Sequence, residues 1–322
     1  MTEGGRVRLA VDLLYYTGKR GGTETYARQV LPRLAAAWPE LELVGLVGSA
    51  GLEEVSGWFP GTVHPVPFVG ENRPLWALAE TALIARRTAR LGADLLWCPA
   101  NFGPGTGSVP RVVTLHDVIA FEFPNPETSR VTQEVTTWII RRTARTAAHV
   151  ITDSEASAQA VVRVLGIPRD RITPTPLAGS SPAAVEDPDA ELAALGVDPG
   201  RALVLSTGNR MPHKNFAGLL RALARIPAGQ RPQLALTGSH GDDPLAPLVA
   251  ELGLAEDVLL LGWVTSAQLE ALYGRAAVYA CPSLSEGFGL PVLDAMRRGC
   301  PVVAADIPVL REVGGEAARY AD

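Results

Sequence analysis

The amino-acid sequence predicts an α/β protein built from two domains, each with a parallel β-sheet. Short runs of β-branched and other apolar residues alternate with helical periodicity along both halves of the chain, which is the pattern of βαβ units. A stretch rich in Pro, Ser, Ala and Asp, residues 172–190, interrupts this alternation before it restarts. With 322 residues the chain can bury two cores. We therefore place the first domain at residues 1–180, a linker at 181–200 and the second domain at 201–322.

Each domain is expected to place its strands in one parallel sheet, with helices in the intervals. In the first half, strands are expected at residues 7–13, 43–47, 95–98, 111–116 and 149–152. In the second half, they are expected at residues 202–207, 233–237, 258–261, 278–281 and 301–304. The helices that matter below are expected at residues 23–34, 134–148 and 290–298.

Composition excludes several classes of protein. The net charge of −5 argues against nucleic acid as a partner. Cys98, Cys281 and Cys300 lack the spacing of metal ligands and lie in apolar runs, which predicts buried thiols in a reducing compartment and no zinc site. The start of the chain, MTEGGRVRLAVDLLYY, has too short an apolar run for a signal peptide or a membrane span. We expect a soluble, cytoplasmic protein.

The most informative stretch is SEGFGLPVLDAM, residues 285–296, which combines two carboxylates, a glycine-flanked turn and a helix start. Pro291 suits a first helical turn, so the helix should begin near Leu290. A helix start carries partial positive charge and unsatisfied N–H groups, which suits a diphosphate. Glu286 would lie in the loop before the helix, and Asp294 one turn inside it. The alternative is a carboxylate that only favours the helix dipole, followed by an exposed helical acid.

A basic loop opens the second domain. Residues 203–220, LVLSTGNRMPHKNFAGLL, lead from a strand through a Gly-Asn turn into a helix, with Arg210 and Lys214 four residues apart. A guanidinium and an ammonium group can converge there on one diphosphate. A solvated basic turn is the alternative, but the position between strand and helix favours phosphate binding. Asn209 and His213 are interpreted as supporting residues, with His213 a surface imidazole.

Two further groups lie in the first half. His116 and Asp117 end the apolar strand RVVTLH, at the sheet edge where open α/β folds bind ligands. A structural histidine and a turn-capping aspartate are the alternative. The loop from Gly18 ends in Gly21 and Gly22, whose bare backbone can approach a donor phosphate or an acceptor. No G-x-G-x-x-G follows the first strand, which argues against a dinucleotide oxidoreductase.

These blocks, in this order, resemble the retaining GT-B glycosyltransferases of family 4, and the likeness covers nearly the whole chain. Two acidic residues separated by seven others, around GFGLP, match the family's signature, and residues 203–220 match its donor-phosphate loop. The resemblance implies two Rossmann-like domains whose sheets face a cleft, with the acceptor side in the first domain and the nucleotide sugar in the second. The family continues for several helices beyond the equivalent of Asp322, so the resemblance also implies a truncated C-terminal end and an incomplete second domain.

The resemblance also implies a role for each group. Glu286 would hold hydroxyls of the donor sugar, His116 would reach the same sugar, and Asp117 would orient its loop. Asp294 takes the position that grips the nucleotide ribose, where the family usually has a Glu; being one methylene shorter, it needs a water or a closer approach. The catalytic residues expected are His116, Asp117, Arg210, Lys214 and Glu286. The nucleotide-sugar contacts expected are Gly21, Gly22, Gly287, Phe288, Gly289, Leu290 and Asp294.

The implied reaction is a transfer with retention on one face of the sugar, in which the leaving diphosphate helps to remove the acceptor's proton. Arg210, Lys214 and the helix start would replace the metal that many other glycosyltransferases use, so neither a metal nor a cofactor is expected. The HDV and PHKN segments favour GDP-mannose over UDP-hexose or dTDP-hexose as donor. The acceptor would be a hydroxyl of a glycan, a lipid-linked molecule or a small molecule. A nucleotide-sugar epimerase of the same fold and a catalytically weak nucleotide-sugar binding protein stay open as alternatives.

A basic stripe accompanies the helix expected at residues 134–148. Its members, at spacings of three and four, are Trp138, Arg141, Arg142, Arg145 and His149. We interpret them as solvated side chains whose stems cover the helix. Contact with anionic lipid or a phosphorylated acceptor is the alternative, so association with the inner face of a membrane stays open.

Overall fold

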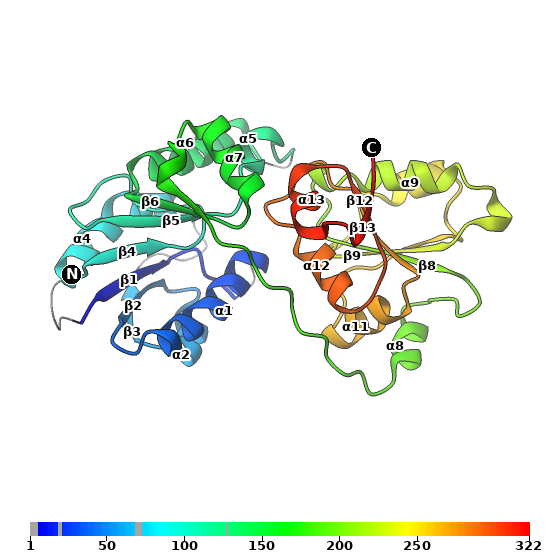
Figure 1. The fold of residues 1–322 in the computed structure, drawn as a ribbon, viewed down its shortest axis with the longest axis horizontal. Helices are drawn as coiled ribbons and strands as arrows, with labels where there is room; N and C mark the ends of the chain where they lie inside the picture. Colours follow the sequence, from blue (N-terminus) through cyan, green and yellow to red (C-terminus); the bar gives the residue numbers. More distant parts are fainter. Residues whose placement is uncertain (1–5, 19–20, 68–72, 127) are drawn as a thin grey trace. The chain divides into compact units, whose positions relative to one another are not determined.

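The computed structural model of the chain describes residues 6–18, 21–67, 73–126 and 128–322 (Figure 1). Its internal contacts divide into two compact units. The first runs to Thr175, apart from residues 122–125 and 154–156, which pack with the second unit, residues 176–322. Each unit contains one parallel sheet with helices, so the predicted fold class is confirmed.

The first sheet has seven parallel strands in the order β3-β2-β1-β4-β5-β6-β7. The strands are β1 (Arg8–Leu13), β2 (Glu42–Gly48), β3 (Thr62–Val66), β4 (Leu95–Cys98), β5 (Arg111–Leu115), β6 (His149–Thr152) and β7 (Ile172–Pro174). The helices are α1 (Gly21–Ala37), α2 (Leu52–Trp58), α3 (Arg73–Leu78), the π-helical η1 (Ala79–Leu83), α4 (Ile84–Arg90), α5 (Ile119–Glu122), α6 (Arg130–Thr146), α7 (Glu155–Leu165) and the short η2 (Arg169–Arg171).

Helices cover both faces of this sheet, as Figure 1 shows for α6 and α7 on one side and α1 and α2 on the other. One core gathers Ile84 of α4, Ile140 of α6 and Val161 of α7. The other gathers Ala27 and Leu31 of α1. Since both faces are buried, the central strands are continuous apolar runs, which is why the sequence pattern identified them.

The second sheet has six parallel strands in the order β10-β9-β8-β11-β12-β13. The strands are β8 (Leu203–Thr207), β9 (Gln233–Thr237), β10 (Val258–Leu260), β11 (Val278–Cys281), β12 (Val302–Ala305) and β13 (Ala318–Ala321). The helices are α8 (Pro188–Ala194), η3 (Pro212–Lys214), α9 (Phe216–Ala224), η4 (Ala228–Gln230), α10 (Ala246–Glu251), α11 (Ser266–Arg275), α12 (Leu290–Arg297) and α13 (Pro308–Gly314).

The linker predicted at residues 181–200 is not a separate segment. It contains α8, which packs against α11 and carries Leu192 into the second core, and Val197 follows it there. Asp187 caps α8 by accepting a hydrogen bond from the amide of Ala190. The Pro-rich composition therefore marks a helix start as well as a connection.

The prediction missed β3, β7 and β13. Each of these strands lies at an edge of its sheet, and both β3 and β7 contain a proline. Proline is tolerated on an edge strand because one side of that strand needs no ladder hydrogen bonds. An edge strand also lacks the long apolar run of a central one, so its pattern is weak.

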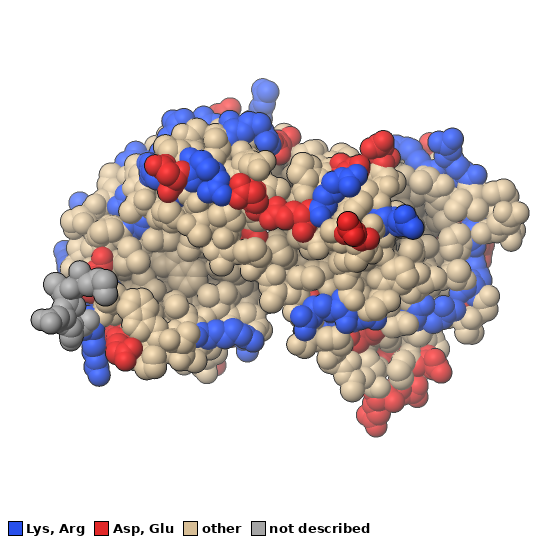
Figure 2. Space-filling model, viewed as in Figure 1, with Lys and Arg blue, Asp and Glu red and all other residues tan. Residues whose placement is uncertain are grey.

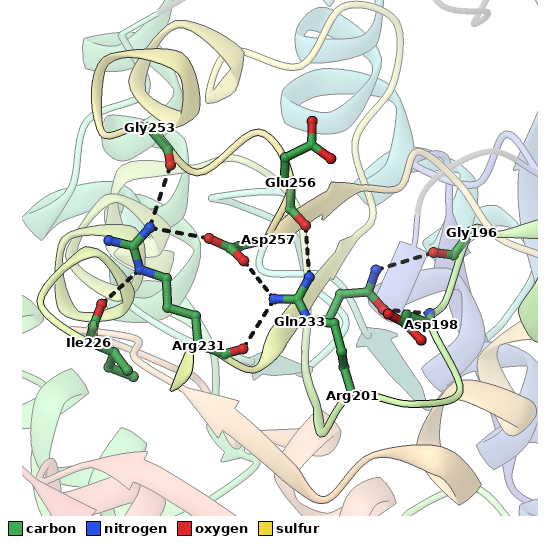
Figure 3. Close-up of polar contacts among 9 residues, drawn as sticks. All are labelled: Gly196, Asp198, Arg201, Ile226, Arg231, Gln233, Gly253, Glu256 and Asp257. Carbon is green, nitrogen blue, oxygen red and sulfur yellow. Dashed lines mark hydrogen bonds and ion pairs between the residues drawn. The ribbon is translucent and has the colours of Figure 1, made fainter. Parts of the chain in front are cut away.

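The amino ends of β8, β9 and β10 are held together by a polar network around the buried carboxylate of Asp257 (Figure 3). Arg201 and Arg231 donate to its two oxygens over 2.6 and 3.2 Å. The same guanidinium groups also bind main-chain carbonyls, and Gln233 bridges to Gly196 over 3.2 Å. The network lies at the amino ends of these strands, so the edge of the sheet formed by their carboxyl ends carries none of its residues. The candidate site described next lies at that carboxyl edge.

Candidate functional site

Lys214 and Glu286 meet in the second unit, with Nζ 2.6 Å from Oε1. Lys214 ends η3 in the loop after β8, and Glu286 lies in the loop between β11 and α12. β8 and β11 are parallel neighbours, so both loops leave the same edge of the sheet. The two side chains are 14 and 10 % exposed, and Glu286 is the one acceptor found for Lys214 in the described part of the chain. Two predicted site residues are thereby brought together.

A glycine makes room for this ion pair. Gly208 follows β8 with φ +142°, a backbone conformation that side chains disfavour. A Cβ at this position would lie 3.3 Å from Cε of Lys214. The bare backbone thus lets the lysine stem cross the end of the strand toward Glu286.

His213 differs from the surface imidazole that the sequence predicted. It is buried, and its carbonyl accepts a hydrogen bond from Leu284 N over 2.7 Å, which ties η3 to the loop that carries Glu286. Its Nδ1 is buried without a partner among the described residues. Burial and the adjacent Lys214 lower the pKa of His213, so the neutral imidazole is favoured.

The start of α12 has the geometry of an anion site. Gly289 adopts φ +96° at the N-cap, and Pro291 lies in the first turn, as predicted. In the described residues, no acceptor is found for the amides of Phe288, Gly289 and Leu290. Phe288 is buried, and Gly287 accepts a hydrogen bond from Ser154 Oγ over 3.0 Å. The amides and the positive end of the helix dipole lie directly after Glu286 in the chain.

The expectation that Arg210 converges with Lys214 on a diphosphate requires correction. Nε and Nη2 of Arg210 donate to Asp243 over 3.0 and 2.8 Å. Nη1 donates to the carbonyls of Gly208 and Thr237, both over 2.9 Å, and Nη2 also donates to Leu236 over 3.2 Å. Because a guanidinium has five N–H groups, this set uses all of them. Arg210 ties the loops after β8 and β9 together and has no donor left for a phosphate.

Asp294 lies one turn inside α12, as predicted, but its Oδ1 is occupied. Ser180 donates to it from both its amide, over 2.7 Å, and its hydroxyl, over 2.8 Å. Arg298 approaches the same oxygen at 3.8 Å. The segment around Ser180 therefore supplies two donors to the carboxylate that the resemblance assigns to the ribose.

In the first unit, His116 is buried at the end of β5 with both ring nitrogens engaged. Nδ1 lies 2.7 Å from Asp153 Oδ2, and Nε2 lies 2.8 Å from the carbonyl of Pro99. Since both partners are acceptors, only the imidazolium donates to both. Burial lowers the pKa of His116, but the hydrogen bond and charge of Asp153 outweigh it, so the pKa stands above its usual value.

The sequence analysis missed Asp153 and Asp243. Asp153 follows β6, the parallel neighbour of β5, and Asp243 lies in the loop after β9, the neighbour of β8. Parallel neighbours end at one edge, so strand order places the loops that carry these residues together, but no motif marks either acid as the partner.

Asp117 and the two glycines complete the predicted set. Asp117 Oδ1 accepts a hydrogen bond from the amide of Ile119 over 2.9 Å, which holds the turn into α5. Gly21 and Gly22 are exposed and form the first turn of α1, which begins earlier than predicted. Of the predicted loop from Gly18 to Gly22, residues 19 and 20 lie outside the described part of the chain. These groups belong to the first unit, whereas the ion pair of Lys214 and Glu286 belongs to the second.

No group of three or more His, Cys, Asp or Glu side chains in the described ranges is arranged to hold a metal ion. Cys98, Cys281 and Cys300 are buried and free, as predicted, and burial raises the pKa of each thiol.

Two family models match the chain. The model described as Glycosyltransferase Family 4 matches residues 20–177, and the model described as Glycosyl transferases group 1 matches residues 188–319. The chain is 36 % identical to O-antigen chain mannosyltransferase B of Escherichia coli over 265 residues, which covers 78 % of the chain and 68 % of the relative. It is 29 % identical to D-inositol 3-phosphate glycosyltransferase of Nocardia farcinica over 329 residues, covering 90 and 71 %.

Solved structures share the fold at low sequence identity. Sucrose-phosphate synthase from Thermosynechococcus elongatus superposes with a TM-score of 0.71 at 20 % identity, covering 98 % of the chain and 86 % of the neighbour. Anabaena Alr3699/HepE, in complex with UDP and glucose, gives a TM-score of 0.68 at 21 % identity, covering 98 and 85 %. The two parallel-sheet units are thus those of the GT-B fold.

Proposed function

The chain belongs to the glycosyltransferases of group 1 and family 4, and on this premise we propose that it transfers a hexose from a nucleotide diphosphate sugar to a hydroxyl acceptor, with retention and without a metal ion. One observation carries the proposal. Lys214 and Glu286, 72 residues apart in the chain, meet at 2.6 Å, and Glu286 is followed within four residues by the start of α12. A cation, a carboxylate and an amide-lined helix start are the groups that a diphosphate and a sugar need.

Lys214 stabilises the leaving diphosphate in this proposal. As the bond to the sugar breaks, negative charge grows on the phosphate oxygens, and an ammonium group already fixed in place stabilises that charge without reorganising. The amides of Phe288, Gly289 and Leu290 contribute from the positive end of the helix. Together they supply the charge that a metal ion supplies in other glycosyltransferases.

Glu286 orients the sugar and the lysine. A carboxylate bound to an ammonium over 2.6 Å is a weak nucleophile, because its charge is already neutralised by a short ion pair. A double-displacement route through a covalent intermediate needs a free carboxylate at the anomeric carbon. We therefore propose that Glu286 accepts hydrogen bonds from the sugar hydroxyls, and that the reaction runs on one face of the sugar, with the diphosphate taking the acceptor's proton.

Arg210 and His116 act on the site through other residues. Arg210 fixes the loop after β8 through Asp243 and so positions Lys214. His116, held by Asp153 and Pro99, fixes the end of β5 in the first unit. Asp294 binds the ribose after Ser180 gives up one of its two hydrogen bonds.

We propose GDP-mannose as the donor. The Escherichia coli relative is named a mannosyltransferase, and the HDV and PHKN segments of this chain favour the same sugar. Base recognition falls to the loop after β10, where Trp263 is exposed and stacks on His240 at 5.1 Å between ring centroids. The acceptor is a hydroxyl of a glycan, a lipid-linked molecule or a small molecule.

Calorimetry with GDP-mannose, UDP-glucose and dTDP-glucose tests the donor, and nucleotide release with and without an acceptor panel tests transfer. We expect release that requires an acceptor, a product with the donor's anomeric configuration by proton NMR, and a rate unchanged by EDTA. Lys214→Ala should abolish release while the protein stays folded. If the chain binds a donor but releases no nucleotide with any acceptor of the panel, it is a nucleotide-sugar binding protein. If it alters the sugar of the donor in the absence of an acceptor, it is an epimerase.

A further inference from the structure

One face of the first unit is unusually apolar. Nine large hydrophobic side chains are exposed among the described residues, and five of them lie on α3, η1 and α6. They are Leu78, Leu83, Val131, Val135 and Trp138, which are 60, 38, 70, 45 and 53 % exposed. Scattered exposed hydrophobic residues are ordinary, but a group on neighbouring helices marks an interaction surface.

These helices form one continuous surface. Residues of η1, α4 and α6 pack into the same core, so the helices cover the same face of the first sheet. The loop after β4 joins them, since Trp76 of α3 packs on Phe102 at 4.8 Å and Thr143 of α6 donates to Gly103 over 2.6 Å. We call the surface made by α3, η1, α4 and α6 the α4–α6 face.

The α4–α6 face is also cationic. Its exposed basic side chains are Arg86, Arg90, Arg130, Arg141, Arg142 and Arg145, and its one exposed acid in the described helices is Glu134. Six positive charges less one negative charge give +5, whereas the whole chain carries −5. Figure 2 shows Lys and Arg along the margin of the first unit where α6 runs.

On α6 the exposed apolar side chains and the exposed basic side chains lie in one stripe along the helix. Val131, Val135 and Trp138 are followed by Arg142 and Arg145 at helical spacings of four and three. The Arg142 guanidinium lies over the Trp138 ring at 5.3 Å from its centroid. The sequence alone suggested solvated arginines here; the exposed valines and tryptophan change that interpretation, because solvated arginines need no apolar neighbours.

We propose that the α4–α6 face docks on an anionic lipid bilayer. The tryptophan and aliphatic side chains would enter the interfacial layer, and the arginines would bind lipid phosphates. A second copy of the chain is a poor occupant, because a two-fold contact would place one +5 face against another. None of the described helices has both the length and the hydrophobicity to span a bilayer. The inference goes beyond the transfer reaction and does not depend on it.

Co-sedimentation with phosphatidylcholine vesicles, alone or mixed with phosphatidylglycerol, tests the proposal on the full chain. We expect binding only to the mixed vesicles, and less binding as salt is raised. Each arginine near an anionic surface strengthens binding about five-fold, so Arg86→Gln with Arg90→Gln should weaken binding about 25-fold. Trp138→Ala should weaken it several-fold.

Matched controls separate this face from general effects. Trp38→Ala removes another exposed tryptophan of the first unit, and Arg221→Gln with Arg225→Gln removes two exposed arginines four residues apart on and after α9. Both should bind vesicles as the parent does. The proposal would be overturned if all variants lost vesicle binding equally, if the chain bound vesicles of phosphatidylcholine alone, or if it did not bind the mixed vesicles. So would a dimer in light scattering that Trp138→Ala dissociates, because the occupant would then be a second copy.

Discussion

Replacing Arg210 distinguishes a structural clamp from a phosphate ligand. Arg210→Met leaves the Asp243 carboxylate, whose side chain is 9 % exposed, without its cation, and removes one hydrogen bond from each of three carbonyls, two of which keep a main-chain donor. Removing one partner of a buried ion pair costs about 3–5 kcal/mol of unfolding free energy. Because the clamp joins loops of one sheet, we expect that loss to appear in the urea denaturation midpoint.

The partner substitution provides the control. Asp243→Asn breaks the same clamp and keeps the guanidinium, so the two variants should share any effect that arises from a loosened loop. In the double variant, Arg210→Met with Asp243→Asn, no buried charge is left without a partner. The double variant should therefore lose less unfolding free energy than the sum of the two single losses, with a coupling of about 1–3 kcal/mol.

Affinity for nucleoside diphosphate, measured by calorimetry under native conditions, completes the comparison. Lys214→Met should weaken it by roughly 10- to 100-fold, the value of one charge-assisted hydrogen bond. Arg210→Met should weaken it no more than Asp243→Asn does. The reasoning fails if Arg210→Met alone matches Lys214→Met in lost affinity while its urea midpoint stays at the parent's value.

Three further substitutions test separate parts of the structure. Ser180→Ala removes a donor from Asp294 and should tighten nucleoside diphosphate binding by several-fold in calorimetry; weaker binding would mean that Ser180 positions the carboxylate. Burial raises the pKa of Asp12 to about 6, so the native state holds a proton that the unfolded state releases, and stability should fall as pH rises between about 4 and 6. Asp12→Asn keeps the acceptor for Leu14 N and should make that decline shallower in urea titrations, while Glu80, whose pKa burial also raises, accounts for the remainder; an unchanged slope would assign all of the decline to other groups. Asp257→Asn should lower the urea midpoint without changing donor affinity, since the carboxylate lies at the opposite edge of the sheet from Lys214.

The sequence predicted the central strands of both sheets and the edge strand β10, and it missed the other edge strands that the structure describes. β4, β6, β9 and β11 were predicted at their observed bounds, because a central parallel strand is a short apolar run between turns. The edge strands β3, β7 and β13 carry less apolar signal, and α8 starts with Pro188, in the proline-rich stretch that also marks a linker. Local composition therefore identified the central strands and one described edge strand, β10, but not β3, β7 or β13.

The position of the candidate site was predictable from the sequence, but the hydrogen-bond and ion-pair partners of its side chains were not. Strand ends and glycine turns locate Lys214, Glu286 and the start of α12 at one edge, since parallel strands place their following loops together. What each side chain binds depends on residues distant in the chain. Arg210 meets Asp243 and Asp294 meets Ser180, and neither partner belongs to a motif.

The different roles of Arg210 and Lys214 follow from how their donors are arranged. A guanidinium holds five N–H groups in a rigid plane, so it can saturate a fixed set of carboxylate and carbonyl oxygens, as Arg210 does. An ammonium has three rotatable donors, and Lys214 spends one on Glu286 in the described structure. Two donors can therefore turn to phosphate oxygens without breaking the ion pair, so donor binding need not leave Glu286 alone. An arginine in place of Lys214 would be the worse phosphate ligand, and a lysine in place of Arg210 the worse clamp, because a ligand needs donors that can turn and a clamp needs donors that are fixed.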